Sequence, residues 1–319
     1  MQEPTPLQLL PRLSEILDIE LYVKRDDLAG PSIGGNKSRQ LEYYFGAALS
    51  ANADTILITG AVQSNFARLA AAVAASQNMH AVVQLEERVK SSGRAYHENG
   101  NVLLARMLGA EILSYPEGED ETGADAALYT YAEKLRSDGR TPYVIPLGED
   151  HPPIGALGYV DAAHEIMMQA SDFDVFVVAS GSGATHSGLL TGVRDAGSSA
   201  KVIGSCVRRD AGQQRPRIQR TISRLADLHP GAEKVSSEDI IVWDGALAPG
   251  YGKAGEQARG AIDDMAQIEG LILDPVYTAK SFAAVTALTG TGEVRPGSKV
   301  CFVHTGGLAA VFAYANALV

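Results

Sequence analysis

Short apolar segments alternate with longer amphipathic segments along nearly the whole chain. The short ones have the length of buried strands, and the longer ones repeat apolar residues at helical spacing. This rhythm predicts an α/β fold with twisted parallel sheets covered by helices on both faces. The predicted strands are residues 21–24, 55–59, 81–85, 111–114, 143–145, 175–179, 202–207, 240–242 and 300–304. The predicted helices are residues 38–49, 64–76, 100–108, 124–137, 156–170, 185–193, 213–226, 254–268, 279–288 and 308–316.

The alternation is interrupted near residues 146–153, where proline, glycine and acidic residues gather. Such composition is typical of a boundary between folding units. We therefore expect a small α/β domain over residues 38–147 and a large domain formed by residues 1–37 and 148–319. With 319 residues the chain is long enough for both, because single cores stop growing near ~250–300 residues.

Composition narrows the range of partners. The formal net charge is -11, so nucleic acid and anionic membranes would repel the protein. No apolar run reaches the ~18 residues of a membrane span, and the start of the chain lacks the features of a signal peptide. Cys206 and Cys301 lie in apolar segments as expected for buried free thiols, and no Cys/His spacing suggests a metal site. We expect a cytoplasmic protein that acts on a small molecule.

Two glycines and Asn36 directly precede Lys37. Glycine permits a tight turn and a close approach of a ligand to the backbone. A lysine shielded from water at such a turn has a lowered pKa and can form a Schiff base with pyridoxal phosphate (PLP). The alternative is that Lys37 is an ordinary charge at the start of the helix 38–49.

A second segment, which we call the glycine loop, follows the strand 175–179 and precedes a helix. It consists of Ser180, Gly181, Ser182, Gly183, Ala184 and Thr185. Backbone N–H groups and hydroxyls at a helix start favour phosphate binding, and a monophosphate without an adenosine site fits PLP. The loop matches neither the P-loop nor the dinucleotide motif. A tight turn without a ligand is the alternative interpretation.

Two further groups of residues are candidates for substrate contact. Gln63, Ser64, Asn65 and Phe66 lie at the start of a helix, where Ser and Asn either cap the helix or bind a substrate carboxylate. Near the C-terminus, Tyr251 and Tyr277 lie in glycine- or proline-containing turns, and Thr305 follows an apolar strand and precedes two glycines. Buried tyrosines more often pack than catalyse, so packing is the alternative there.

Five motifs in this order resemble the D-cysteine desulfhydrase and 1-aminocyclopropane-1-carboxylate (ACC) deaminase family of PLP enzymes, which has the tryptophan-synthase β-like fold, PLP fold type II. They read GGNKSRQL (34–41), GAVQSNFAR (60–68), SGSGATHSGL (180–189), DPVYTAK (274–280) and HTGG (304–307). The resemblance spans residues 5–314, and it implies a homodimer. It also implies that Lys37 carries PLP, that Asn36 hydrogen-bonds the PLP 3-oxygen and that the glycine loop binds the phosphate.

By the same resemblance, Ser64 and Asn65 bind the substrate carboxylate, Gln63 and Phe66 lie beside them, and Tyr251 and Tyr277 flank the substrate. Thr305 faces the pyridine nitrogen. Catalysis is then expected from Lys37, Tyr277, Tyr251 and Ser64.

The resemblance also bears on the substrate. ACC deaminases are similar to one another in having Glu and Leu where this chain has Thr278 and Thr305, so the sequence resembles the desulfhydrase branch. Phe66, Ala279 and Ala309 depart from the family pattern. We expect a PLP-dependent carbon–sulfur lyase that converts D-cysteine to pyruvate, ammonia and sulfide. The alternatives are cysteate sulfo-lyase, ACC ring opening, racemase or dehydratase chemistry, and a non-catalytic PLP-binding protein.

A basic cluster remains outside these motifs: Arg208, Arg209, Arg215, Arg217 and Arg220. We expect solvated charge on a helix face, with an acidic co-substrate or a subunit contact as the alternatives.

Overall fold

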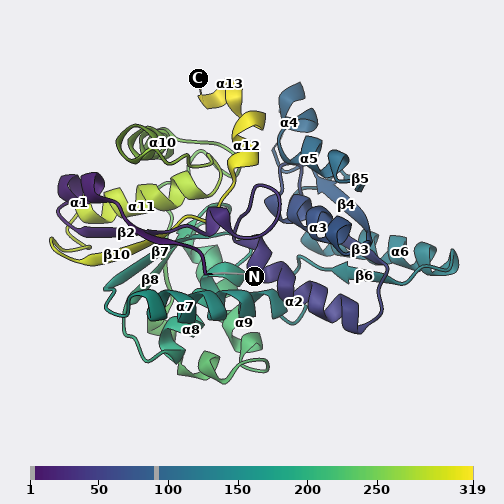
Figure 1. The fold of residues 1–319 in the computed structure, drawn as a ribbon, viewed down its shortest axis with the longest axis horizontal. Coiled ribbons are helices and arrows are strands. Elements are labelled where there is room, and N and C mark those ends of the chain that lie inside the picture. Colours follow the sequence, from purple (N-terminus) through teal and green to yellow (C-terminus); the bar gives the residue numbers. More distant parts are fainter. Residues whose placement is uncertain (1–3, 90–92, 319) are drawn as a thin grey trace.

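The structure is a computed structural model that describes residues 4–89 and 93–318. It contains two sheets flanked by helices (Figure 1). The strands are β1 (Leu7–Leu9), β2 (Glu20–Lys24), β3 (Thr55–Ala61), β4 (His80–Glu86), β5 (Glu111–Tyr115), β6 (Pro142–Ile145), β7 (Val175–Ser180), β8 (Lys201–Cys206), β9 (Ile241–Trp243) and β10 (Lys299–Val303). The α-helices are α1 (Pro11–Leu17), α2 (Lys37–Ser50), α3 (Asn65–Ser76), α4 (Arg94–Glu98), α5 (Asn101–Met107), α6 (Glu121–Ser137), α7 (Leu157–Gln169), α8 (Ala184–Asp195), α9 (Ala211–Leu225), α10 (Glu256–Glu269), α11 (Thr278–Gly290), α12 (Leu308–Ala313) and α13 (Ala315–Leu318). Short 3-10 helices are η1 (Asp26–Leu28), η2 (Ile154–Ala156), η3 (Pro230–Lys234) and η4 (Ser237–Asp239).

The larger sheet has the strand order β1-β2-β10-β7-β8-β9, and the smaller sheet has the order β5-β4-β3-β6. All neighbours are parallel except β1 and β2, which are antiparallel. The predicted α/β class is therefore confirmed, and each predicted strand corresponds to one of β2–β10. The sequence prediction missed β1, α1 and α4, and the predicted helix 308–316 is divided near Tyr314 into α12 and α13.

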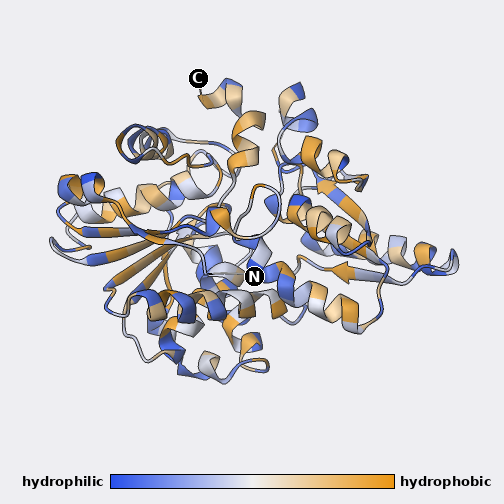
Figure 2. Cartoon of the chain, in the orientation of Figure 1, coloured by the Kyte–Doolittle hydropathy of each residue, from blue (hydrophilic) through white to orange (hydrophobic). Residues whose placement is uncertain are grey.

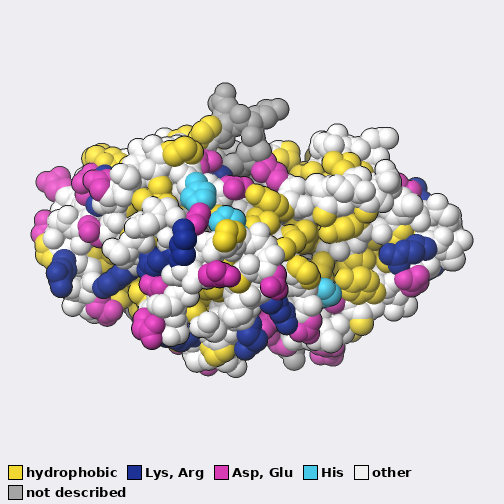
Figure 3. All heavy atoms as spheres, turned by 90° about the horizontal axis from the view of Figure 1, so that it is seen from below, with side chains coloured by type: hydrophobic (Ala, Val, Ile, Leu, Met, Phe, Trp, Pro, Cys, Tyr) yellow, Lys and Arg dark blue, Asp and Glu magenta, His cyan; other side chains and the backbone are white. Residues whose placement is uncertain are grey.

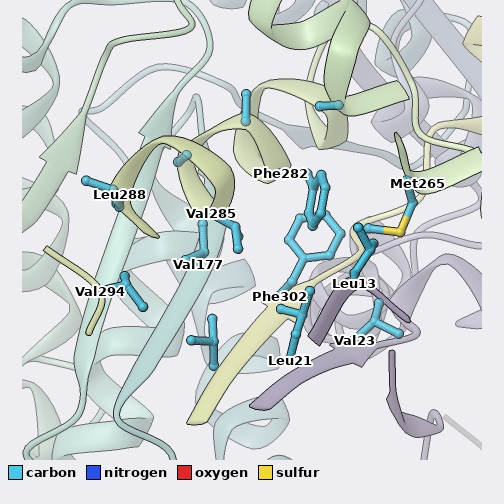
Figure 4. Close-up of a cluster of buried hydrophobic side chains, with 14 of the residues drawn as sticks. Leu13, Leu21, Val23, Val177, Met265, Phe282, Val285, Leu288, Val294 and Phe302 are labelled. Carbon is cyan, nitrogen blue, oxygen red and sulfur yellow. The ribbon is translucent and has the colours of Figure 1, made fainter. Parts of the chain in front are cut away.

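Alternate residues of the larger sheet enter two separate cores. Val177 and Phe302 pack with Phe282 of α11 and the residues of α1 and α10 on one face (Figure 4). Phe176 and Val303 point to the other face, where α7, α8 and α9 cover the sheet. This two-residue period follows from strand geometry, and it explains why the strands read as continuous apolar runs (Figure 2).

The smaller sheet has the same two-sided cover, with α2, α3 and α5 on one face and α6 on the other. Its strands all lie between Thr55 and Ile145, whereas the strands of the larger sheet lie outside that range. Helix α2 runs between the sheets and packs against both α3 and α7. The predicted domain boundaries at residues 38 and 147 remain a prediction.

Cys206 and Cys301 are buried and free, as predicted. Acidic and basic side chains are interspersed on the face shown in Figure 3. Within residues 4–89 and 93–318, no helix combines the length and the hydropathy that crossing a membrane requires.

Candidate active site

A cleft lies between the two sheets, beyond the carboxyl ends of β3, β7, β8 and β10. Parallel sheets commonly bind ligands at this end of their strands. Most of the predicted site residues line the cleft, although they come from four distant parts of the chain. These lining residues are Asn36, Lys37, Ser64, Asn65, Phe66, Gly181, Ser182, Gly183, Thr185, Tyr251, Tyr277 and Thr305.

Lys37 is the first residue of α2, one position earlier than the predicted helix start, and its half-buried side chain enters the cleft. Burial disfavours the charged ammonium and lowers the pKa of Lys37 to about 8. Its Nζ donates one long hydrogen bond, of 3.4 Å, to Gln40 and lies 5.4 Å from the Phe66 ring centroid. About a tenth of the amine is therefore neutral and nucleophilic at pH 7.

Two glycines allow the turn before Lys37 to touch the end of β10. Gly35 has φ +130° and Gly306 has φ +90°, values that residues with a side chain rarely adopt. A Cβ on Gly306 would lie 2.9 Å from the Gly35 Cα. The contact also includes a hydrogen bond of 3.0 Å from the Asn36 N–H to the Thr305 carbonyl. The backbones at Gly35 and Gly306 lie too close together for side chains to fit between them, and this contact holds Lys37 and Thr305 in the same cleft.

The glycine loop forms the next wall, at the start of α8. Within the described part of the chain, the backbone N–H groups of Ser182, Gly183, Ala184 and Thr185 donate to no protein acceptor. Unused donors at a helix N-terminus are suited to an anion such as a phosphate group. The loop therefore fits the phosphate of PLP.

Thr185 connects this loop to the lysine turn. Its Oγ1 accepts hydrogen bonds from Asn36 Nδ2 at 2.9 Å and from Gln40 Nε2 at 2.8 Å. Because both lone pairs of the hydroxyl are used, its proton is left to donate. Thr185 lines the cleft, so that proton is available to a bound anion.

Three of the predicted residues lie outside the lining of the cleft. The Ser180 hydroxyl contacts His186 Nδ1 at 3.2 Å and accepts from Gln214 at 2.9 Å. Ala184 faces a neighbouring cavity. Gln63 is buried with its amide nitrogen donating to the carbonyls of Tyr96 and Asn99. The motifs do not contain the direction of these side chains, which is why the sequence placed them in the site.

Ser64 combines the two interpretations that the sequence left open. Its hydroxyl caps α3 by accepting from the Ala67 N–H at 3.1 Å, and the residue also lines the cleft. The hydroxyl proton remains available to a ligand. Asn65 accepts from Asn101 Nδ2 at 2.9 Å, which fixes its orientation beside Ser64.

Tyr251 and Tyr277 form a hydroxyl pair at 2.6 Å, and both residues line the cleft. Burial and the neighbouring Tyr251 raise the pKa of Tyr277 well above its usual value, so Tyr277 is protonated and can act as a donor. The turn before Tyr251 is held by Lys280, whose Nζ donates to the carbonyls of Leu247 at 2.9 Å and Gly250 at 2.8 Å.

Thr278, one of the two positions by which the sequence resembles the desulfhydrase branch, does not line the cleft. It is fully buried at the first position of α11, and its hydroxyl donates to Asp274 Oδ1 at 2.8 Å. The side chain of Thr278 therefore belongs to the helix cap, and any influence on the substrate is indirect.

The sequence analysis missed three charged residues of the lining: Arg88, Glu121 and Arg208. Arg88 donates to Glu86 at 2.7 Å. Glu121 accepts from Arg208 and also, at 2.8 Å, from Arg209. Arg88 and Glu121 belong to no recognised motif, so only the basic pair 208–209 gave a signal.

The expectation of a solvated basic helix face was wrong for part of the basic cluster. The side chains of Arg208 and Arg217 are only 5% and 4% exposed, and each is paired with acidic residues. Arg215 and Arg220 are exposed, as expected. The buried members of the cluster are paired with carboxylates from the other side of the cleft.

The fold is that of an α/β enzyme, and one cleft is lined by both an amine of lowered pKa and a loop suited to an anion. Residues 1–306 match the family model described as "Pyridoxal-phosphate dependent enzyme". The chain belongs to this family of PLP-dependent enzymes. The residues described above fit the cofactor, since Lys37 supplies an amine and the glycine loop supplies N–H donors that have no acceptor among residues 4–89 and 93–318.

Two named enzymes are similar to this chain over nearly its whole length. The chain is 39% identical over 314 residues to the D-cysteine desulfhydrase of Salmonella choleraesuis, covering 98% of this chain and 94% of the relative. It is also 39% identical over 317 residues to the Klebsiella pneumoniae enzyme of the same name, with the same coverage.

Solved structures show the same fold. An ACC deaminase homologue has a TM-score of 0.86 at 35% identity and covers 99% of this chain and 93% of its own. The threonine deaminase isoform 2 of Solanum lycopersicum has a TM-score of 0.68 at 18% identity over 96% of this chain and 84% of its own, which supports the fold alone.

Proposed function

We propose that the protein is a PLP-dependent carbon–sulfur lyase that converts D-cysteine and water to pyruvate, ammonia and hydrogen sulfide. The observation that carries this proposal is that the Lys37 amine and the Tyr251–Tyr277 hydroxyl pair line one cleft. Such a pair supplies a base and an acid for an elimination. The similarity to enzymes named D-cysteine desulfhydrase supports the choice of substrate.

The cofactor would be held by Lys37, Asn36, Thr305 and the glycine loop. When bound, PLP supplies an electron sink that makes the α-proton of an amino acid removable. Asn36 retains one amide proton beyond its bond to Thr185, and that proton is free for a ring oxygen. The Thr305 hydroxyl lies in the same cleft and is suited to a hydrogen bond with a ring nitrogen.

The protein then has to move two protons. The Lys37 amine, with its lowered pKa of about 8, accepts the α-proton from the substrate. The protonated Tyr277 hydroxyl donates to the departing sulfur, and Tyr251 lies 2.6 Å behind it to return a proton. Ser64 and Asn65, at the N-terminus of α3, orient the substrate carboxylate.

A second candidate is the elimination of sulfite from cysteate, and a specific observation favours it. Arg88 and Arg208 line the cleft, and cationic groups there would stabilise an anionic leaving group. Both guanidinium groups are already paired, Arg88 with Glu86 and Arg208 with Glu121. This pairing reduces the positive charge available to a substrate, so we place D-cysteine first.

The decisive experiment is a panel of D- and L-cysteine, D- and L-cysteate, ACC and serine, with sulfide, sulfite, ammonia and keto acid measured separately. We expect sulfide and pyruvate from D-cysteine at the highest kcat/KM. Sulfite from cysteate at higher kcat/KM would select the second candidate, and 2-oxobutyrate from ACC would select ring opening. A loss of optical rotation without keto acid would indicate a racemase, and no turnover of any compound would indicate a binding protein.

We also propose that the protein is a cytoplasmic homodimer. Ile272, Leu308 and Phe312 are exposed apolar side chains, with Phe312 56% exposed. Apolar residues of this kind favour burial against another chain. Light scattering of the purified protein should give twice the chain mass, and a monomer at micromolar concentration would contradict the proposal.

A further inference from the structure

Side chains of α9 and of Arg209, which precedes that helix, contact carbonyl groups of the glycine loop. Arg217 Nε donates to the Ser182 carbonyl at 2.7 Å. Gln214 Nε2 and Arg209 Nη1 donate to the Gly181 carbonyl at 3.1 Å and 3.4 Å. Gln214 and Arg217 are both buried. Two successive carbonyl groups of the loop are thus held by donors that do not themselves line the cleft.

Because the peptide bond is planar, the hydrogen bonds to these carbonyl groups also fix the direction of the N–H groups that follow them. In a trans peptide the carbonyl of one residue and the N–H of the next point in opposite directions. The donors on the Gly181 and Ser182 carbonyls therefore turn the N–H groups of Ser182 and Gly183 away from α9. These are two of the N–H groups that have no acceptor within the described residues. Their residues line the cleft.

Arg217 is also attached to two carboxylates. Its Nη1 donates to Glu121 at 3.0 Å and to Glu149 at 2.8 Å. Burial disfavours the charge of Glu121, but Arg217, Arg209 and Arg208 outweigh this effect and lower its pKa to about 2. Glu121 begins α6, which covers the smaller sheet, whereas the glycine loop belongs to the larger sheet. One guanidinium therefore connects the two sides of the cleft.

We propose that Arg217 is a positioning residue that directs the N–H groups of the glycine loop toward the cofactor phosphate, and that its bond to Glu121 couples this orientation to the placement of α6. The inference rests on the cofactor site of the proposed function. It assigns a role to the buried part of the basic cluster, which the proposed reaction leaves unused.

The test compares the binding of PLP and of pyridoxal, which lacks the phosphate, to the apoprotein. In Arg217→Met, which removes every donor of the side chain, the affinity for PLP should fall about tenfold or more while that for pyridoxal stays within about twofold. Arg217→Lys keeps a charge beside the carboxylates but not the planar fork, so it should recover only part of the loss. Arg215→Met is the matched control, because Arg215 is exposed on the same helix and donates to Ser237 instead.

The coupling is tested separately with Glu121→Gln, which leaves Arg217 intact. This variant should lower the affinity for PLP relative to pyridoxal in the same direction as Arg217→Met. No change in that ratio would overturn the coupling to α6. If Arg217→Met fails to fold, Arg217→Lys decides, because a fully retained ratio in that variant would overturn the positioning role.

The result for the unmodified protein separates this inference from the proposal on which it rests. If the unmodified apoprotein binds pyridoxal as tightly as PLP, the glycine loop is not a phosphate site and both fail. If it prefers PLP and Arg217→Met keeps the full preference, only the inference fails. Equal losses for PLP and pyridoxal in Arg217→Met would also overturn it, since they would indicate a structural role unrelated to the phosphate.

Discussion

Lys37 and Lys280 show that two lysines with similarly lowered pKa values can have different roles. Burial lowers the pKa of Lys37 and that of Lys280 to about 8. Lys280 donates two hydrogen bonds, at 2.9 Å and 2.8 Å, to carbonyl groups of the turn before Tyr251. Lys37 faces the cleft, and its hydrogen bond to Gln40 is 3.4 Å long. A lowered pKa therefore does not identify the reactive amine, and a weakly bonded amine that faces the cleft is the better criterion.

The largest expected effect separates the two lysines directly. Lys37→Ala removes the amine that we propose binds the cofactor and takes the α-proton, so kcat should fall by about 10⁴-fold or more. Borohydride reduction of the PLP-loaded protein followed by peptide mapping should place the label on Lys37. A label on Lys280 would reverse the comparison.

The next effect concerns the tyrosine pair on the Lys280 side of the cleft. Tyr277→Phe keeps the ring and removes only the hydroxyl, so it should lower kcat by about 10²–10⁴-fold, the usual contribution of a positioned proton donor. Retention of PLP and an unchanged melting temperature are the controls. A kcat close to that of the unmodified enzyme would show that the pair only packs.

A smaller effect is expected when the structural lysine itself is changed. Lys280→Met leaves two carbonyl groups without their donor and frees the turn that carries Tyr251, so kcat/KM should fall roughly 10–100-fold. The PLP content should remain that of the unmodified protein, because Lys280 is not expected to bind the cofactor. Loss of PLP from this variant would show that the two lysines are not as independent as their contacts indicate.

The smallest effect is a pH dependence that belongs to Lys37 alone. Only the neutral amine reacts with an aldehyde, and a pKa of about 8 means that the neutral fraction rises about tenfold between pH 7 and 9. The rate of PLP uptake by the apoprotein, followed by absorbance, should rise accordingly and level off above that range. Lys280→Met should show the same profile, and a flat profile in either protein would contradict the lowered pKa of Lys37.

The sequence predicted the fold well where the pattern is strong. Strand β7, for example, is buried throughout and is a nearly continuous apolar run, so the sequence predicted it at the correct place in the chain. Strand β1 was missed because it has three residues, none of them buried, and pairs only at the sheet edge. A segment that short carries too little periodicity to separate it from a loop.

The sequence indicated which segments form the candidate site, but not the directions in which their side chains point. The motif around Ser64 correctly indicated a helix start beside the cleft, yet Gln63, one residue earlier, bonds to backbone carbonyls elsewhere. The pairing of Glu121 with Arg208 joins residues that are 87 positions apart, and neither position implies the other. Such contacts follow from the packing of the two sheets, which a local pattern does not contain.

The pairing of β2 with β10 has a consequence for biosynthesis. Residues Glu20–Lys24 hydrogen-bond to residues Lys299–Val303, so the larger sheet cannot close until almost the last residue has left the ribosome. The smaller sheet is built from contiguous chain between Thr55 and Ile145 and has no such delay. Because contacts of long sequence separation form late, the nascent chain exposes the apolar edge of β2 throughout translation. Cofactor capture must therefore follow synthesis, since the Gly35–Gly306 contact beside Lys37 forms only when both ends of the chain meet.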